Sequence, residues 1–411
     1  MKNGKSFILI FTLIGLIMIL SRCFSCVEKD NDPRGEMFIG SASCRQCHKS
    51  IYDSYVVTAH YKSTQISSDK NIQGSFIHGK NAFTVNPETQ IVMEHRDSGT
   101  FQVLYINGKE KEIHRMDITF GTKHAQTFLY WHGNKTFELP ISYYTSVQSW
   151  ASSPGYPSVL NFIRPINKGC FECHSSYIGS NSIEANQVIE EALNKSSLIT
   201  GIDCERCHGP ATNHVNYHLA YPDVKEAKYM VTSNTLSRQQ KLDACAVCHS
   251  GNDKKKEISS FSFKMGDTLA NLFLPWATRS KITTGFDVHG NQYQLLSESK
   301  CFLKSKTLGC VTCHNPHTDK SSDLNEYSKK CLSCHQDTDH SSLKMDEATA
   351  SAIKANCIDC HMPEQASRAI TFQVSGSDSI SSYLLRTHKI AVYHEKKIGN
   401  ILQFLKKNKT I

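Results

Sequence analysis

The pattern of apolar and polar positions is most regular between residues 71 and 148. Phe101 to Ile106 and Lys109 to His114 both favour extended structure, and the Asn107-Gly108 pair between them suits a type I′ hairpin turn. The same region offers further extended segments and a second turn, at Gln90–His95, Met116–Phe120, Gln126–Trp131, Lys135–Leu139 and Trp131–Asn134. The pattern predicts a small antiparallel β module.

Helical patterns are short and scattered through the rest of the chain. We expect helices at Ile51–Val57, Ile183–Lys195, Arg238–Ala244 and Ala348–Ala355. In the second of these, Glu190-Glu191 and Lys195 allow an ion pair between residues four apart. Towards the end of the chain we expect a Ser-rich bend between two extended segments and then a final helix, at Ile370–Val374, Tyr383–Tyr393 and Ile401–Leu405.

The N-terminal segment is typical of a bacterial secretory signal peptide. An apolar run from Phe7 to Leu20 follows Lys2 and Lys5. A permanent membrane span would need about twenty apolar residues, which makes it the weaker interpretation. Cys26, preceded by the small Ser25, resembles a lipoprotein processing site, and Cys23 is the alternative acceptor. The segment therefore predicts export and attachment to a membrane through a lipid.

Seven of the eight Cys-x-x-Cys pairs in the chain are followed at once by His. This string is the attachment signature of haem c: the two thiols bond to the porphyrin edge and the His binds the iron as proximal ligand. In chain order, strings 1 to 7 are Cys44, Cys47, His48; Cys170, Cys173, His174; Cys204, Cys207, His208; Cys245, Cys248, His249; Cys310, Cys313, His314; Cys331, Cys334, His335; and Cys357, Cys360, His361. The sequence predicts seven covalently attached haem c groups.

Zinc knuckles and disulfides explain the cysteines less well. Zinc sites have no reason to place His directly after every pair, and an odd number of pairs cannot combine two by two. A disulfide framework is typical of short secreted chains, whereas this chain has 411 residues. Cys301 is the one cysteine beyond the leader that lies outside the strings. We interpret it as a small buried side chain, with a role as iron ligand or in sulfur chemistry as the alternative.

The spacing of the strings predicts the architecture. String 1 stands apart from the other six, which follow one another so closely that haem must supply much of their apolar interior. We therefore expect a mainly α fold with extensive irregular loops and the small antiparallel β module inserted between strings 1 and 2. The predicted division is a leader (1–26), a string 1 segment (27–69), a β-rich insert (70–165), a six-haem core (166–365) and a C-terminal return segment (366–411).

Several passages resemble the multihaem cytochromes related to the tetrahaem cytochrome c-554 of ammonia oxidisers and, more distantly, hydroxylamine oxidoreductase. They are residues 40–60, Gly201–Pro210, Cys310–His317 and Cys357–Pro363. The resemblance implies a multihaem cytochrome c fold in which a second His binds the far side of most irons. This superfamily contains both carriers and enzymes, so the resemblance leaves the activity open.

Thirteen His lie outside the strings, more than seven irons require. Similar proteins use a His at the position of His60 as distal ligand, and position along the chain makes six others candidates. The complete set of distal candidates is His60, His124, His214, His218, His289, His317 and His388. We interpret the remaining ones, His78, His95, His114, His132, His340 and His394, as structural or solvent-facing.

Charge and ligand type point to an electron carrier. The polypeptide charge of +8 is offset by haem propionates, which explains many Lys and Arg better than nucleic acid does. Irons with two His ligands are saturated and suited to passing electrons. We therefore expect a periplasmic or outer-membrane cytochrome that exchanges electrons with other cytochromes or quinol-linked donors and has no catalytic residues. The alternative is a reductase or oxidase of nitrite, hydroxylamine or tetrathionate with one open haem.

Overall fold

The computed structural model describes residues 32–156, 161–185, 188–251, 256–273, 285–337, 340 and 347–393. About 27% of the chain is helix and about 29% is strand. The expectation of a mainly α fold is therefore wrong. Three stretches without haem strings form antiparallel sheets. The first has a core of its own, and the two later hairpins bury their apolar side chains against it and against α4.

The β module contains two antiparallel sheets. The larger sheet runs in the order β1 (Thr64–Ile66), β6 (Ile118–Phe120), β7 (Ala125–His132), β8 (Lys135–Glu138) and β11 (Arg164–Ile166), with β9 (Ile141–Tyr144) paired to β7 and β10 (Ser149–Ser152) paired to β9. The smaller sheet contains β2 (Ala82–Asn86), β3 (Thr89–Arg96), β4 (Gly99–Ile106) and β5 (Lys109–Arg115). Asn107 and Gly108 turn between β4 and β5 with φ of 51° and 70°. The hairpin predicted there is confirmed.

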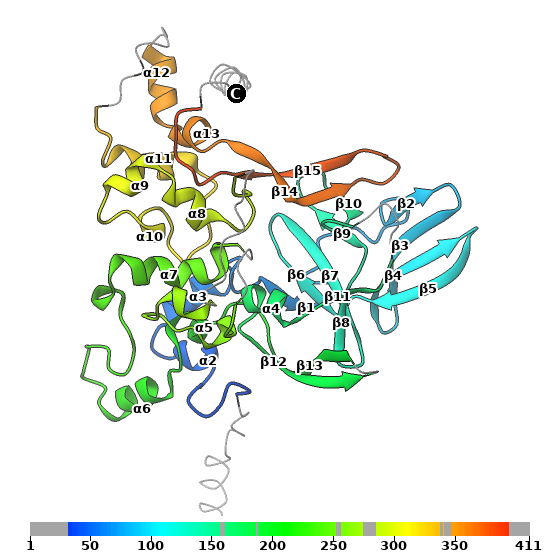
Figure 1. Cartoon of the computed structure of the whole chain (residues 1–411), viewed down its shortest axis with the longest axis horizontal. Coiled ribbons are helices and arrows are strands. Elements are labelled where there is room, and N and C mark those ends of the chain that lie inside the picture. Colours follow the sequence, from blue (N-terminus) through cyan, green and yellow to red (C-terminus); the bar gives the residue numbers. More distant parts are fainter. Residues whose placement is uncertain are drawn as a thin grey trace, which may run out of the picture.

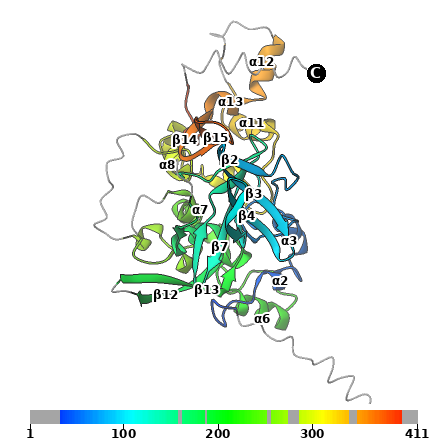
Figure 2. The ribbon, with the colours of Figure 1, turned by 90° about the vertical axis from the view of Figure 1, so that its right-hand side faces the viewer.

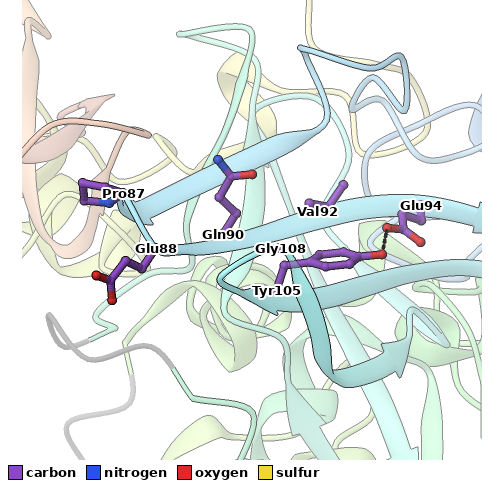
Figure 3. A pocket seen from close by; sticks show the side chains of 7 residues that line it. All are labelled: Pro87, Glu88, Gln90, Val92, Glu94, Tyr105 and Gly108. Atoms are coloured by element: carbon purple, nitrogen blue, oxygen red, sulfur yellow. Dashed lines mark hydrogen bonds between the residues drawn. The ribbon is translucent and has the colours of Figure 1, made fainter.

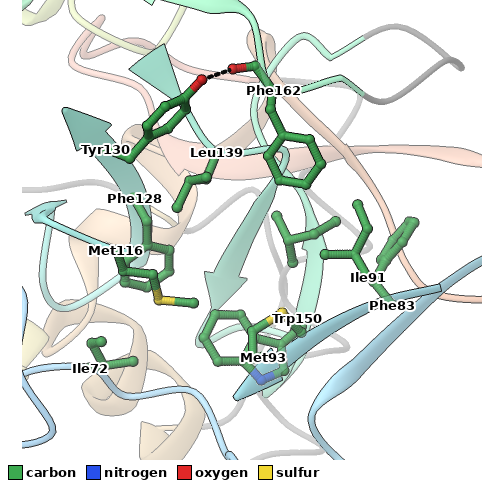
Figure 4. Packing of buried hydrophobic residues seen from close by; sticks show 11 residues of the cluster. Ile72, Phe83, Ile91, Met93, Met116, Phe128, Tyr130, Leu139, Trp150 and Phe162 are labelled. Carbon is green, nitrogen blue, oxygen red and sulfur yellow. Dashed lines mark hydrogen bonds between the residues drawn. The ribbon is translucent and has the colours of Figure 1, made fainter. Parts of the chain in front are cut away.

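One apolar core joins the two sheets (Figure 4). Ile91 and Met93 of β3 lie against Phe128 of β7 and Trp150 of β10, and all four side chains are buried. The Trp150 indole N–H donates to the carbonyl of Ser75 at 2.8 Å. The ring covers Gly74 so closely that a Cβ there would approach a ring carbon to 2.1 Å, so only glycine fits.

Short helices occupy the other side of the molecule (Figure 1). In chain order they are α2 (Ser41–Cys44), α3 (Lys49–Tyr55), α4 (Lys168–His174), α5 (Cys204–His208), α6 (Thr212–Ala220), α7 (Arg238–His249), α8 (Gln292–Ser297), α9 (Lys300–Lys304), α10 (Cys310–Cys313), α11 (Leu324–Leu332), α12 (Glu347–Lys354) and α13 (Cys357–His361), with 3₁₀ turns η1 (Ser233–Thr235), η2 (Ser260–Ser262) and η3 (Leu269–Leu272). The predicted helices at Ile51–Val57, Arg238–Ala244 and Ala348–Ala355 are confirmed as parts of α3, α7 and α12. None of the described helices combines the length and apolar character needed to cross a bilayer.

The helix expected at Ile183–Lys195 is wrong, because this stretch forms a hairpin of β12 (Tyr177–Ala185) and β13 (Val188–Ile199). Leu193 is buried against Leu129 and Phe171, and its N–H donates to the carbonyl of Asn134 at 2.7 Å. Glu190 pairs with Lys135 of β8 instead of with its own segment. Contacts with the β module therefore override the local helical preference.

The C-terminal segment returns to the β module as a hairpin of β14 (Glu364–Gln373) and β15 (Ile380–Arg386). Phe372 stacks on Tyr144 with ring centres 4.2 Å apart. The extended segments predicted here are confirmed as far as Arg386. The leader and the predicted helix at Ile401–Leu405 lie outside the described residues.

Burial of Glu138 on β8 predicts a pH-dependent contribution to stability. Burial raises the pKa of this carboxyl from 4.5 to about 7, although Arg164 lies 3.0 Å away. The folded protein therefore binds more protons at Glu138 than the unfolded chain does between these two values. Stability from this group is full below about pH 4.5 and is lost as the pH rises towards 7, by up to roughly 3 kcal/mol.

Glu138→Gln should flatten this part of the pH profile when Tm of the haem-loaded protein is measured between pH 4.5 and 7.5. The matched control is Glu110→Gln, because Glu110 pairs with Arg96 on an exposed strand. A profile of Glu138→Gln identical to that of the control would contradict the assignment.

Candidate haem-binding site

The two cysteines of each string lie one helical turn apart. Residues three apart on a helix face the same side, so both thiols of a string can reach one porphyrin edge. A polar side chain caps the N-terminus of several of these short helices. The Asp203 carboxylate accepts from the N–H of Arg206 at 2.7 Å at the start of α5, and the Asn356 side chain accepts from the N–H of Asp359 at 3.2 Å at the start of α13.

Five of the seven string histidines face a second histidine ring. The centres of the facing rings are 6.0 to 6.4 Å apart. These pairs are His48 with His214, His249 with His60, His208 with His317, His314 with His388, and His361 with His340.

This spacing fits a metal held between two imidazoles. A ring nitrogen lies about 2 Å from a bound metal, which puts the centres of two opposed rings roughly 6 Å apart. Rings packed directly on each other would lie closer, as His114 and Tyr130 do at 4.1 Å. The donor set and its spacing therefore fit haem iron with two axial histidines.

The other predicted histidines have different surroundings. Burial lowers the pKa of His174 to about 4, and the positive charge of the nearby His289 lowers it further. The Tyr383 hydroxyl lies 3.2 Å from Nδ1 of His124, and the ring of His218 lies 4.7 Å from that of His214. His335 is exposed, and no ring within the described part of the chain faces it.

Backbone and amide oxygens orient several of the facing rings. Nδ1 of His214 lies 2.8 Å from the carbonyl oxygen of Lys228, and Nδ1 of His361 lies 3.0 Å from that of Ala391. Nδ1 of His249 lies 3.4 Å from the side-chain oxygen of Gln292. A proton on Nδ1 that is donated in this way leaves Nε2 as the nitrogen available to a metal.

Thiols of different strings meet in pairs. The hydrogen bond between Cys44 and Cys204 lowers the pKa of the Cys204 thiol to about 7 and raises that of Cys44. Three further pairs share a hydrogen bond in the same way: Cys173 with Cys248, Cys245 with Cys310, and Cys331 with Cys357. These contacts connect strings 1 with 3, 2 with 4, 4 with 5, and 6 with 7.

Two further pairs of thiols lie near enough to affect each other electrostatically, and they complete the series. Cys207 of string 3 raises the pKa of Cys245 in string 4, and Cys313 of string 5 raises that of Cys331 in string 6. The strings therefore follow one another in space as 1, 3, 4, 5, 6 and 7, with string 2 beside string 4. In Figure 1 the same series runs through α2, α5, α7, α10, α11 and α13 along one flank.

A buried ion-pair network joins strings 1 and 3. Arg34 lies 2.8 Å from Asp203 and 3.2 Å from Glu205, and all three side chains are buried. Glu205, inside string 3, also accepts from the N–H groups of Ile39, Gly40 and Ala211 at 2.8 to 3.1 Å. This carboxylate therefore fixes the chain before string 1 against string 3.

A second internal carboxylate joins string 2 to a distant loop. Glu172 accepts from the hydroxyls of Ser259 and Ser260 and from the Lys256 ammonium at 2.5 to 3.1 Å. Burial opposes ionisation, but these partners outweigh it and lower the pKa of Glu172. String 2 is thereby attached to η2.

His340 and the two internal carboxylates are parts of the site that the sequence did not predict. His340 comes five residues after His335 in a polar segment, and no local pattern distinguishes it from a solvated His. Glu172 and Glu205 did carry a signal, because each is an acidic residue inside a string that must be largely buried against haem. Cys301 lies near Cys313 and Cys331 and raises the pKa of both.

A hollow on the smaller sheet has no part in this arrangement (Figure 3). It is lined by Pro87, Glu88, Gln90, Val92, Glu94, Tyr105 and Gly108, none of which belongs to a string. The Tyr105 hydroxyl donates to Glu94 at 2.7 Å within it.

Comparisons with known proteins agree with the site. Residues 141–209, which include strings 2 and 3, match the family model described as cytochrome c554 and c-prime. The multiheme cytochrome MtrA of Shewanella baltica is 26% identical over 181 residues, which are 40% of this chain and 51% of MtrA. The chain thus spans about half the length of that relative.

The fold is similar to that of the outer cell wall cytochrome OcwA. The two structures align with a TM-score of 0.52 over 89% of this chain and 82% of OcwA, at 14% sequence identity. With the strings and the facing histidines, these findings define the chain as a multihaem c-type cytochrome.

The network around Arg34 predicts a large effect of Glu205→Ala. The substitution leaves one buried and two partly buried N–H groups without their acceptor and removes one partner of a buried ion pair, at a cost on the order of 3 kcal/mol. Glu110→Ala is the matched control, because it breaks an arginine pair on an exposed strand. Tm of the haem-loaded proteins should fall clearly for Glu205→Ala and little for Glu110→Ala. Equal shifts would show that the buried carboxylate has no special role.

Proposed function

We propose that this protein is an exported electron carrier with seven haem c groups, one on each string. When bound, each haem supplies an iron that exchanges one electron at a time. The observation that supports the proposal is the close succession of strings 1, 3, 4, 5, 6 and 7, whose thiols share hydrogen bonds or affect each other electrostatically. This order would bring the edges of neighbouring porphyrins together, as a relay requires.

The chain's own residues would hold each iron between two imidazoles. The proposed axial pairs for strings 1 to 5 and 7 are His48 with His214, His174 with His289, His208 with His317, His249 with His60, His314 with His388, and His361 with His340. In this assignment most distal ligands come from a segment far from the string that they serve. Each haem would then fasten two parts of the chain together. His124 and His218 would be second-layer residues that contact Tyr383 and His214.

The proposed location is the periplasm or the outer membrane, with a lipid on Cys26 or Cys23 as the anchor. The apolar run from Phe7 to Leu20 supports export. Attachment of haem c outside the cytoplasm agrees with it, and so does the outer cell wall location that the name of OcwA gives for that protein. The partners would be a quinol-linked or cytochrome donor and a second redox protein as acceptor.

Substitution of His340 tests the axial assignment. His340→Ala should leave one five-coordinate iron and therefore add a high-spin ferric EPR signal near one haem per molecule. The matched control is His218→Ala, because His218 also lies beside an axial candidate but is not assigned to an iron. An unchanged low-spin spectrum for His340→Ala would remove His340 from the set.

His335 is the observation that favours a reductase or oxidase of a small nitrogen or sulfur compound. Its exposed ring has no facing ring in the described part of the chain, so string 6 could hold an open iron. His394 lies outside the described residues. EPR of the oxidised wild type decides the point, together with His394→Ala. A high-spin signal already present in the wild type and unchanged by His394→Ala would support the enzyme.

The carrier function itself is tested by reoxidation. The protein is reduced fully and then mixed with ferricyanide, nitrite, hydroxylamine or tetrathionate under anaerobic conditions. A carrier should be reoxidised rapidly by ferricyanide and not by the other three compounds. Reoxidation by any of the three at a rate close to that with ferricyanide would replace the carrier with the enzyme.

A further inference from the structure

Exposed apolar side chains gather around α6. Leu219, Tyr221 and Tyr229 are 64%, 57% and 67% exposed, and Val231 is 40% exposed. Tyr217 joins them, because its ring centre lies 4.9 Å from that of Tyr221 and 5.6 Å from that of Tyr229. The three tyrosines therefore form one aromatic surface, and together with Val231, two residues after Tyr229, they are here called the α6 face. Leu219 lies on another side of α6, because residues two apart on a helix do not share a face.

The α6 face adjoins the place where the N-terminal segment enters the fold. The N–H of Thr212, the first residue of α6, donates to the carbonyl of Met37 at 3.1 Å, and its hydroxyl donates to that of Glu36 at 3.1 Å. Met37 is itself 46% exposed. Figures 1 and 2 both show α2 and α6 together at one end of the molecule, with α12 and α13 at the opposite end.

A lipid at Cys26 would hold this end close to a membrane. Five residues lie between Cys26 and Asp32, the first described residue. Even fully extended, such a segment spans only about 20 Å. Asp32 is in turn fixed to Arg34, which pairs with Asp203 and Glu205. The end of the molecule that contains α2 and α6 therefore has to lie near the bilayer surface.

The side chains of the α6 face suit a bilayer interface better than an anionic surface. Tyr is enriched where membrane meets water, because its ring is apolar and its hydroxyl stays wet. The charged residues nearby, Asp223, Lys225, Glu226 and Lys228, cancel in sign. Contact would therefore be made by the aromatic and aliphatic groups and would depend little on salt.

The backbone holds the α6 face in place next to string 1. Tyr229 has a φ of 56°, a left-handed conformation that is costly for a bulky residue. The preceding carbonyl, that of Lys228, lies 2.8 Å from Nδ1 of His214, the ring that faces His48. The exposed loop is thus tied directly to one of the proposed axial ligands of string 1.

We propose that the α6 face rests on the bilayer that carries the lipid anchor and orients string 1 towards the membrane. This inference relies on the anchor described under the proposed function. String 1 is one end of the series of strings, and string 7 is the other. The membrane contact would therefore set the direction of the relay, with one end at the bilayer and the other end turned away from it.

Lysine labelling on vesicles tests the α6 face. The lipidated, haem-loaded full chain is reconstituted on vesicles of phosphatidylcholine, and anchoring is checked by flotation. A membrane-impermeant acylating reagent then modifies exposed lysines, and peptides are quantified by mass spectrometry. Lys225 and Lys228 should be modified several-fold less in the wild type than in a Tyr221→Glu/Tyr229→Glu double variant. Lys109 and Lys111 on β5 should be modified equally in both.

A matched control separates membrane contact from a general effect of added charge. Ile380→Glu changes a residue that is 72% exposed at the start of β15, and it should leave the protection of Lys225 and Lys228 intact. If the protein floats but these lysines are not protected, the membrane contact of the α6 face is contradicted and the lipid anchor is not. If the protein does not float, both the contact and the anchor are contradicted. Protection that depends on protein concentration and persists without vesicles would mean self-association and would also overturn the inference.

Discussion

The spacing between paired imidazoles is the constraint on which the rest of the structure depends. An iron with two axial histidines requires ring centres roughly 6 Å apart, and a polypeptide rarely keeps such a gap between two side chains without a reason. Here five pairs keep it, at 6.0 to 6.4 Å. In nearly every pair the second ring comes from a segment remote from the string, so each pair brings two distant parts of the chain together. Small apolar clusters around α7 and α8 support the same arrangement.

The contacts that hold neighbouring strings together are polar as well as apolar. Glu205 fixes the chain before string 1 to string 3, and Glu172 fixes string 2 to η2. Both carboxylates lie inside Cys-x-x-Cys pairs, where they are positioned by the same helical turn as the thiols. The strings thus supply both the residues that attach haem and the polar contacts that connect them to neighbouring segments. The β module packs against this array through α4 and the C-terminal hairpin, and its own core contains no residue of a string.

Local chemistry explains which features could be predicted from sequence. The hairpin at Asn107-Gly108 depends on two residues that tolerate positive φ, and the attachment strings depend on a five-residue pattern. Both can therefore be recognised from the sequence alone. His60, His214, His317 and His388 could be proposed as ligands because each stands near a string or a returning segment. His340 could not, since its partner His361 is brought to it only by the packing of α11 and α13.

The stretch that forms β12 and β13 has a helical pattern, but its structure is set by Lys135 and the core around Leu193, which are distant in sequence. The expectation of a mainly α fold failed for the same reason, since it placed a helix where β12 and β13 lie.

Location of the irons in the haem-loaded protein tests the central claim most directly. Anomalous diffraction collected at the iron absorption edge would give these positions without assumptions about the ligands. We expect seven iron sites, with one centred between the rings of each facing pair, in the spatial order 1, 3, 4, 5, 6 and 7 and with the site of string 2 beside that of string 4. Irons displaced from the midpoints of these pairs, or a different order of sites, would contradict the account.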